Sequence, residues 1–256
     1  MDGWEKALDT FLIPWRKRQD VIGILVCGSY ITGTPTKRSD IDLHIITSEE
    51  NDWRERGNEI IDGFLIEYFV NPARQIRAYF QQDYERNKVD SQTMFITGKI
   101  LYDKDGRVAE LKEEARTWLD KGFKEIDATR LSLGKYYLWD ILDNLQDIYE
   151  SGSKSFKYTY FLVLSDVLEF YSRYLKWEKY SPIRVFELMT DPATQKKYLQ
   201  VEYPDQVFRD MFIEAISVSE ESSMLECFEL LVKYVLKKTG GFEIDGWKIR
   251  TPLELK

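Results

Sequence analysis

Residues 28–47 read GSYITGTPTKRSDIDLHIIT and follow a short apolar run, VIGILVC, at residues 21–27. An apolar run of this length that ends at a glycine and a serine predicts a buried strand leading into a tight turn. Gly28 lets a ligand approach the backbone closely, and the backbone N–H groups of such a turn can face an anion. Gly28 and Ser29 are therefore the candidate residues of an anion-binding turn.

Two acidic residues open the next expected strand, at Asp40 and Asp42. Side chains alternate along a strand, so these two carboxylates share one face, roughly 7 Å apart at Cα. Magnesium in proteins is commonly held by one or two carboxylates together with substrate phosphates. The pair is thus a candidate metal site, although a D-x-D pattern also occurs at solvated strand edges.

Glu67 is the candidate for a third carboxylate in the same place. It is the one charged residue in residues 64–70, FLIEYFV, a run that otherwise reads as a buried strand. Asp62-Gly63 just before it predicts a tight hairpin turn between two antiparallel strands. The alternative is a glutamate on an edge strand that faces solvent.

The order of these features resembles the signature of the DNA polymerase β-type nucleotidyltransferase superfamily. Ten residues separate Gly28-Ser29 from the D-I-D-L sequence at residues 40–43, as in that signature, and residues 97–106 are similar to the end of its core in antibiotic-modifying members. The resemblance implies that the Gly-Ser turn holds a nucleoside triphosphate. It also implies that Asp40, Asp42 and Glu67 form the catalytic set and bind Mg²⁺.

The loop before Asp40 carries further candidates for nucleotide binding, namely Lys37, Arg38 and Ser39. The two cations could reach a polyphosphate, or they could simply be solvated. His44, the single histidine, shares a strand face with the paired acids. It is either a general base or, as we favour, a polar residue buried under a helix.

The hydrophobic period changes to a helical one from residue 126 onward. Before that point, helices are expected at residues 72–87 and 108–121, and a short strand at 99–102. The chain is therefore predicted to be α+β, with a nucleotidyltransferase core of mixed β-sheet and helices at residues 1–122 and an α-helical bundle domain at residues 123–256. After two long helices, further helices are expected at residues 183–189, 205–217 and 220–238, and a final hairpin at residues 242–250.

Composition narrows the classes of partner. The net charge is −8 and the isoelectric point is near 5.0, which argues against a nucleic-acid acceptor because phosphate backbones require basic surfaces. The sequence shows neither an apolar run long enough for a membrane span nor a signal peptide at Met1, so we expect a cytoplasmic protein without membrane contact. The two cysteines, Cys27 and Cys227, fit reduced core residues.

Taken together, the resemblance implies an Mg²⁺-dependent adenylyltransferase that transfers AMP from ATP, or from another nucleoside triphosphate, to a hydroxyl of a small acceptor with release of pyrophosphate. The layout resembles antibiotic nucleotidyltransferases, so aminoglycoside-type antibiotics are one acceptor class, with a role in antibiotic resistance. We expect a monomer or homodimer. The alternatives are a protein AMP transferase or antitoxin-like partner, and a non-catalytic nucleotide-binding module. Candidate general bases are Asp90, Asp140 and Asp143.

Overall fold

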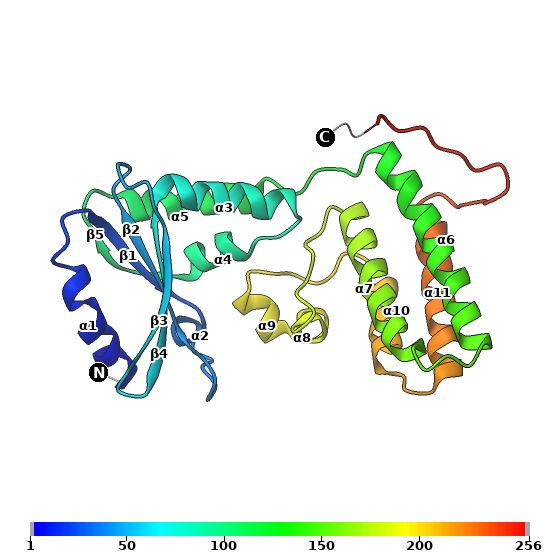
Figure 1. Ribbon diagram of the computed structural model, residues 1–256, viewed down its shortest axis with the longest axis horizontal. Helices are drawn as coiled ribbons and strands as arrows, with labels where there is room; N and C mark the ends of the chain where they lie inside the picture. The colour runs from blue at the N-terminus through cyan, green and yellow to red at the C-terminus, as the bar shows by residue number, and fades with distance from the viewer. Residues whose placement is uncertain (1–2, 254–256) are drawn as a thin grey trace. The chain divides into compact units, whose positions relative to one another are not determined.

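The computed structural model describes residues 3–253, and its contacts divide the chain into two compact units, Met1–Gly122 and Phe123–Lys256 (Figure 1). We call them unit 1 and unit 2. Unit 1 holds a β-sheet with helices on both faces, and unit 2 holds helices and their connections. The predicted α+β class, with a mixed sheet in the N-terminal part and helices in the C-terminal part, is confirmed.

The sheet of unit 1 contains, among the described residues, five strands in the order β3-β4-β2-β1-β5. Their bounds are Val21–Cys27 for β1, Ile41–Thr47 for β2, Glu55–Ile61 for β3, Phe64–Pro72 for β4 and Lys99–Asp103 for β5. The central pair, β2 and β4, is parallel, and the other pairs are antiparallel. This parallel pair fixes the site, because it aligns the beginnings of two strands at the same end of the sheet.

The predicted hairpin between β3 and β4 is confirmed. Ile61 pairs with Phe64 across the turn, and the two turn residues, Asp62 and Gly63, both have positive φ angles, of 51° and 86°. Two successive left-handed residues give the turn a twist that matches the twist of the paired strands, which explains the preference for Asp-Gly at this position.

Helices cover the two faces of the sheet unequally (Figure 1). One face packs against α1, Gly3–Trp15, through an apolar cluster that includes Leu12, Ile41 and Leu43. The other face packs against α3, α4 and α5 through a second cluster that includes Phe80 and Phe95. The bounds are Ala73–Glu85 for α3, Asp90–Thr97 for α4 and Arg107–Asp120 for α5.

Two helix boundaries in unit 1 differ from the expectation. Pro72 ends β4 with an extended backbone, so α3 begins at Ala73, and Asn87 adopts a left-handed conformation beyond the helix end. Residues 90–97 form α4, where the sequence analysis expects no helix. The buried side of α4 holds Gln92 and Thr93 beside Phe95, so its inward face is too polar to give a clear helical pattern.

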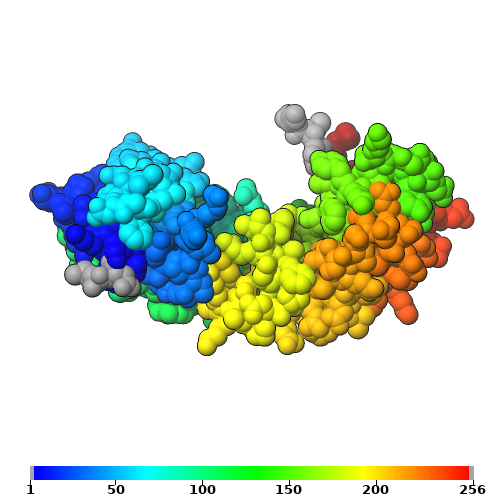
Figure 2. All heavy atoms as spheres, turned by 90° about the horizontal axis from the view of Figure 1, so that it is seen from below, coloured from blue at the N-terminus to red at the C-terminus, as the bar shows by residue number. Residues whose placement is uncertain are grey.

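Unit 2 is built mainly from α6, Ala128–Glu150, α7, Phe156–Tyr174, and α11, Glu221–Lys238, which pack on one another, with α10, Gln206–Ser217, against α11. Figure 2 shows the orange surface of α10 and α11 against the green surface of α6. Two short helices, α8 at Val185–Thr190 and α9 at Pro192–Lys197, lie between α7 and α10 in the chain. The core of unit 2 is rich in aromatic side chains, among them Tyr160, Tyr171, Phe208 and Phe228.

The expected hairpin at residues 242–250 is wrong, because this segment contains no strand in the described structure. Trp247 instead lies flat on Tyr136 of α6, with ring centroids 4.3 Å apart, and its indole N–H donates to Ser132 at 3.2 Å. Asp245-Gly246 does form a turn, but the residues after it gain more by packing on α6 than by pairing with each other. Among the described helices, none combines the length and the apolar character needed to cross a membrane.

Candidate functional site

Three carboxylates meet at one end of the parallel strand pair. Asp42 on β2 pairs in register with Glu67 on β4, and Asp40 stands one residue before β2. Each side chain offers an oxygen, and these oxygens lie within 4.8 Å of one another. All three residues are partly exposed. We call Asp40, Asp42 and Glu67 the acid cluster.

Gly28 is required by the acid cluster itself. Its φ of 76° and ψ of −161° place it in a region that side-chain-bearing residues rarely adopt, and an added Cβ would lie 1.9 Å from Asp42 Oδ2. The contact follows from the register, because Cys27 at the end of β1 pairs with Asp42. The sequence analysis assigns Gly28 to the close approach of a ligand, and the structure adds that the Asp42 carboxylate already fills the space beside it.

Ser29 begins the short helix α2, Ser29–Thr32, directly after Gly28. The backbone N–H groups of Ile31 and Thr32 donate to the Gly28 carbonyl at 3.2 and 3.1 Å, so the turn is closed by its own hydrogen bonds. Ser29 is partly exposed. The turn therefore stands next to the acid cluster, as a phosphate-binding turn would need to do.

Lys37 and Arg38 lie exposed in the loop that leads to Asp40, and Ser39 is partly exposed there. The Ser39 hydroxyl accepts a hydrogen bond from the Thr36 N–H at 2.8 Å, and the Thr36 hydroxyl accepts one from the Arg38 N–H at 3.2 Å. These bonds shape the loop. A contact of Lys37, Arg38 or Ser39 with nucleotide stays a prediction.

Arg56 on β3 is a site residue that the sequence analysis does not find. Its Nε and Nη2 atoms donate to Glu67 Oε1 at 3.1 and 2.6 Å, and its guanidinium lies over the Phe69 ring, 5.0 Å from the centroid. The hydrogen bond and the charge of Glu67 raise the pKa of Arg56. The Asp62-Gly63 turn could have predicted this position of Arg56 from the sequence. A two-residue loop fixes the register and places Arg56 beside Glu67 on one face.

His44 is buried between Phe69 and Phe95, with ring centroids 5.3 and 5.0 Å away. Neither of its ring nitrogens has a hydrogen-bond partner among the described residues. Burial lowers the pKa of His44 to about 4, so the ring is neutral at pH 7. Its position under α4 agrees with the favoured interpretation of His44 as a buried polar residue.

The donor set of the acid cluster suits magnesium. Three carboxylates supply hard, negatively charged oxygens, and their partial exposure leaves room for water and for substrate oxygens, which Mg²⁺ retains in protein sites. The neighbouring thiol of Cys27 offers no competing soft ligand, because burial, with the charges of Asp42 and Asp40, raises its pKa far above neutrality. The residues therefore fit a bound Mg²⁺ ion.

The sheet, the Gly-Ser turn and the acid cluster define a nucleotidyltransferase domain. Residues 13–107 match the family model described as "Polymerase beta, Nucleotidyltransferase", and unit 1 thus carries a domain of the DNA polymerase β-type nucleotidyltransferase superfamily. A crystal structure of a nucleotidyltransferase-like protein from Exiguobacterium sibiricum 255-15 is similar over 92% of this chain and 75% of that chain. The identity is 11% and the TM-score 0.48. No curated protein matches the chain.

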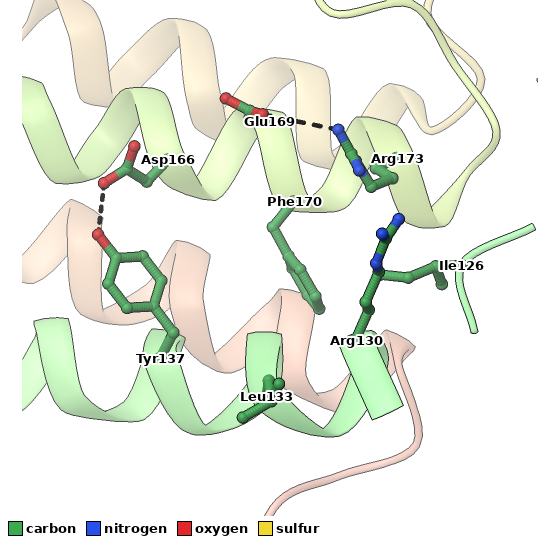
Figure 3. Close-up of a pocket in the computed structure, with 8 residues that line it drawn as sticks. All are labelled: Ile126, Arg130, Leu133, Tyr137, Asp166, Glu169, Phe170 and Arg173. Carbon is green, nitrogen blue, oxygen red and sulfur yellow. Dashed lines mark hydrogen bonds and ion pairs between the residues drawn. The ribbon is translucent and has the colours of Figure 1, made fainter. Parts of the chain in front are cut away.

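Unit 2 contains a separate pocket of about 430 Å³ between α6 and α7 (Figure 3). Figure 3 shows the Tyr137 hydroxyl donating to Asp166, at 2.5 Å, and an ion pair between Glu169 and Arg173. The lining residues are Ile126, Arg130, Leu133, Tyr137, Asp166, Glu169, Phe170 and Arg173. The lining carries two carboxylates, Asp166 and Glu169, and two guanidinium groups, Arg130 and Arg173.

The candidate general bases belong to different units of the chain. Asp90 begins α4 in unit 1 and pairs with Lys88 at 3.1 Å. Asp140 and Asp143 lie on α6 in unit 2, where Asp140 accepts a hydrogen bond from Asn144 at 3.1 Å. The geometry does not single out one of them as the base.

Proposed function

We propose that the protein transfers a nucleoside monophosphate, AMP from ATP, to a hydroxyl of a small acceptor and releases pyrophosphate. One observation carries the proposal. Three carboxylates converge beside a Gly-Ser turn in a domain of the DNA polymerase β-type superfamily. The end of an interior strand pair has no structural need for three like charges whose oxygens lie within 4.8 Å of one another, and such a set is stabilised by a cation.

Each site residue predicted from the sequence has a role in this proposal. Asp40, Asp42 and Glu67 hold Mg²⁺, which when bound neutralises phosphate charge and orients the reacting groups. Gly28 and Ser29 present the turn to the triphosphate. In the loop before Asp40, Lys37 and Arg38 add positive charges and Ser39 adds a hydroxyl at the edge of the triphosphate.

The acceptor is proposed on the basis of charge. A chain with a net charge of −8 repels nucleic acid and suits a neutral or cationic acceptor, so hydroxylated polyamines such as aminoglycosides are the first class to test.

The first experiment measures nucleotide binding by isothermal titration calorimetry, with ATP and the other nucleoside triphosphates, each with and without Mg²⁺. We expect binding that requires the metal and is lost in Asp40→Asn. Asp52→Asn, a substitution at an exposed position in the loop between β2 and β3, is the matched control and should bind as the wild type does. Binding that is absent in the wild type, or unchanged in Asp40→Asn, would contradict the proposal.

A second experiment identifies the acceptor. ATP labelled in the α-phosphate is incubated with Mg²⁺ and with candidate acceptors, and label and pyrophosphate are both followed. Label on a small molecule with equal release of pyrophosphate supports the proposal. Label on a protein band would point instead to a protein AMP transferase, and nucleotide binding without transfer to any acceptor would point to a binding module.

A further inference from the structure

Arg56 takes no part in the proposed function as stated, although its side chain lies in the site. Asn58 pairs with Glu67 and Arg56 pairs with Phe69, so Arg56 is the diagonal neighbour of Glu67 on one face of the β3–β4 pair. Both of its hydrogen bonds to Glu67 reach the same oxygen, Oε1. The Arg56 side chain is 67% exposed, while that of Glu67 is only 16% exposed.

This ion pair supplies the charge that a metal would supply. Glu67 is largely shielded from water and stands close to two other carboxylates, so its charge needs a nearby cation. A guanidinium that donates two hydrogen bonds to one oxygen meets that need. A divalent ion that uses Glu67 as a ligand must then compete with Arg56, or bind beside a positive charge.

We propose that Arg56 is a positioning residue that acts as an internal counter-ion of Glu67 and makes metal binding depend on the nucleotide. Without nucleotide, Arg56 holds Glu67 toward the acid cluster and opposes the divalent ion. A triphosphate brings several negative charges, which give the displaced guanidinium a new partner. Metal and nucleotide therefore strengthen each other's binding, as thermodynamic linkage requires. This inference rests on the proposed function.

The exposure of Arg56 makes this exchange feasible. The guanidinium rests on the Phe69 ring at 5.0 Å as well as on Glu67. A contact of this kind persists when the hydrogen bonds to a carboxylate are broken, because it depends on the ring face and not on the acid. Arg56 can thus leave Glu67 without leaving the neighbourhood of the acid cluster.

The test measures the affinity for Mn²⁺, which takes the same oxygen ligands as Mg²⁺ and is detected in its free form by electron paramagnetic resonance. Wild type, Arg56→Gln, Arg56→Lys and Arg54→Gln are compared with and without the non-transferable analogue α,β-methylene-ATP. Arg54→Gln is the matched control. Arg54 is an exposed arginine two residues away that hydrogen-bonds the Tyr79 hydroxyl.

We expect Arg56→Gln to bind Mn²⁺ alone about tenfold more tightly than the wild type, because a positive charge beside the ion is removed. The gain in Mn²⁺ affinity on adding the analogue should be smaller in this variant than in the wild type. Arg56→Lys retains the charge and should retain most of that gain. Arg54→Gln should match the wild type in both measurements.

The outcomes separate the inference from the proposed function. If Arg56→Gln binds Mn²⁺ alone no more tightly than wild type, while Asp40→Asn loses binding, the counter-ion role is overturned and the metal site stands. If the wild type binds no Mn²⁺ with or without the analogue, both are overturned. Circular dichroism of each variant establishes that it is folded, and the Lys variant provides the same test should Arg56→Gln not fold.

Discussion

The two units surround their key carboxylates in opposite ways. In unit 2, Asp205 accepts hydrogen bonds from the Tyr171 hydroxyl at 2.6 Å, the Tyr234 hydroxyl at 2.9 Å and the Phe208 N–H at 3.1 Å, and Lys238 lies at 3.5 Å. Its donors come from three helices. In unit 1, the acid cluster instead brings three carboxylates together, and Arg56 donates to Glu67, one of the three.

The difference distinguishes a carboxylate that stabilises the fold from carboxylates that we propose to bind a metal ion. Burial raises the pKa of Asp205, but the hydrogen bonds from Tyr171, Phe208 and Tyr234 and the charge of Lys238 outweigh it and lower that pKa. Ionised Asp205 therefore stabilises the fold. Crowded carboxylates repel one another, so the acid cluster is expected to lower the free energy of unfolding. A bound cation should reduce this destabilisation.

The sharpest test compares how one substitution in each unit affects nucleotidyl transfer and stability. Asp40→Asn should reduce nucleotidyl transfer by about 10³-fold, because the charge on the metal site is lost, and should leave the free energy of unfolding unchanged or slightly higher. Asp205→Asn should lower stability while nucleotide affinity stays as in the wild type. Transfer assays and urea denaturation of both variants check that each substitution affects only one of the two properties. A large loss of stability in Asp40→Asn would contradict this expectation.

Gly28→Ala tests the crowding next to the acid cluster. The added Cβ must displace the Asp42 carboxylate, since it would otherwise lie 1.9 Å from Oδ2. A misplacement of about 1 Å in a catalytic group costs about 10²-fold in rate. Gly33→Ala is the control, because Gly33 also has a positive φ, of 81°, but open space where its Cβ would be. Equal transfer rates in the two variants would refute the crowding argument.

Asp205→Ala tests how much the Asp205 carboxylate stabilises unit 2. We expect a loss of about 2–4 kcal/mol in the free energy of unfolding, because the hydroxyls of buried Tyr171 and half-buried Tyr234 lose their acceptor. Asp191→Ala is the matched control. Asp191 caps α9 through bonds from Ala193, at 3.1 Å, and Thr194, at 3.0 Å, within the first turn, so its removal should cost about 1 kcal/mol. Chemical denaturation provides both values.

The pH dependence of stability follows from the lowered pKa of Asp205. A carboxyl whose pKa is lower in the folded than in the unfolded state contributes its full stabilisation above its unfolded pKa, near 4. That stabilisation is lost as the pH falls through the folded pKa. Wild type should therefore lose stability below about pH 4 more steeply than Asp205→Asn does. If the melting temperatures of wild type and Asp205→Asn fell equally as the pH decreased, the lowered pKa of Asp205 would not explain the acid sensitivity.

The smallest expected effect is a gain. His44→Leu replaces a buried ring whose nitrogens have no partner in the described residues with an apolar side chain of similar volume. Removing an unsatisfied buried polar group is worth about 1 kcal/mol or more, so the variant should unfold at a higher urea concentration at pH 7. A loss of stability would show that the ring nitrogens are satisfied, for example by a buried water molecule.

Local sequence signals predict much of unit 1. The apolar run before Gly28, the alternation that begins at Asp40 and the Asp62-Gly63 turn each act over a few residues, and they predict β1, β2 and the β3–β4 hairpin correctly. The meeting of the three carboxylates also follows from strand alternation together with the family resemblance. Their role in binding metal stays a prediction.

What the sequence analysis misses depends on long-range packing. Trp247 finds its partner on α6, more than a hundred residues earlier in the chain, and this contact overrides the local hairpin signal. Arg56 becomes a site residue only through the register of β3 on β4. Phe170, which lines the pocket of unit 2, packs against Gly134 of α6, where an added Cβ would lie 2.0 Å from its ring, and a lone glycine in a helical pattern does not indicate this contact.

The contact between Gly28 and the Asp42 carboxylate links two positions that lie fourteen residues apart in the chain. Residue 28 cannot gain a side chain while the Asp42 carboxylate keeps its place. In a relative that retains the acid, the equivalent of residue 28 should remain glycine, and a relative with a larger residue there should have lost or shortened the acid. A glycine at the position equivalent to residue 28 would thus help to distinguish relatives that retain the metal-binding acid from relatives that keep only the fold.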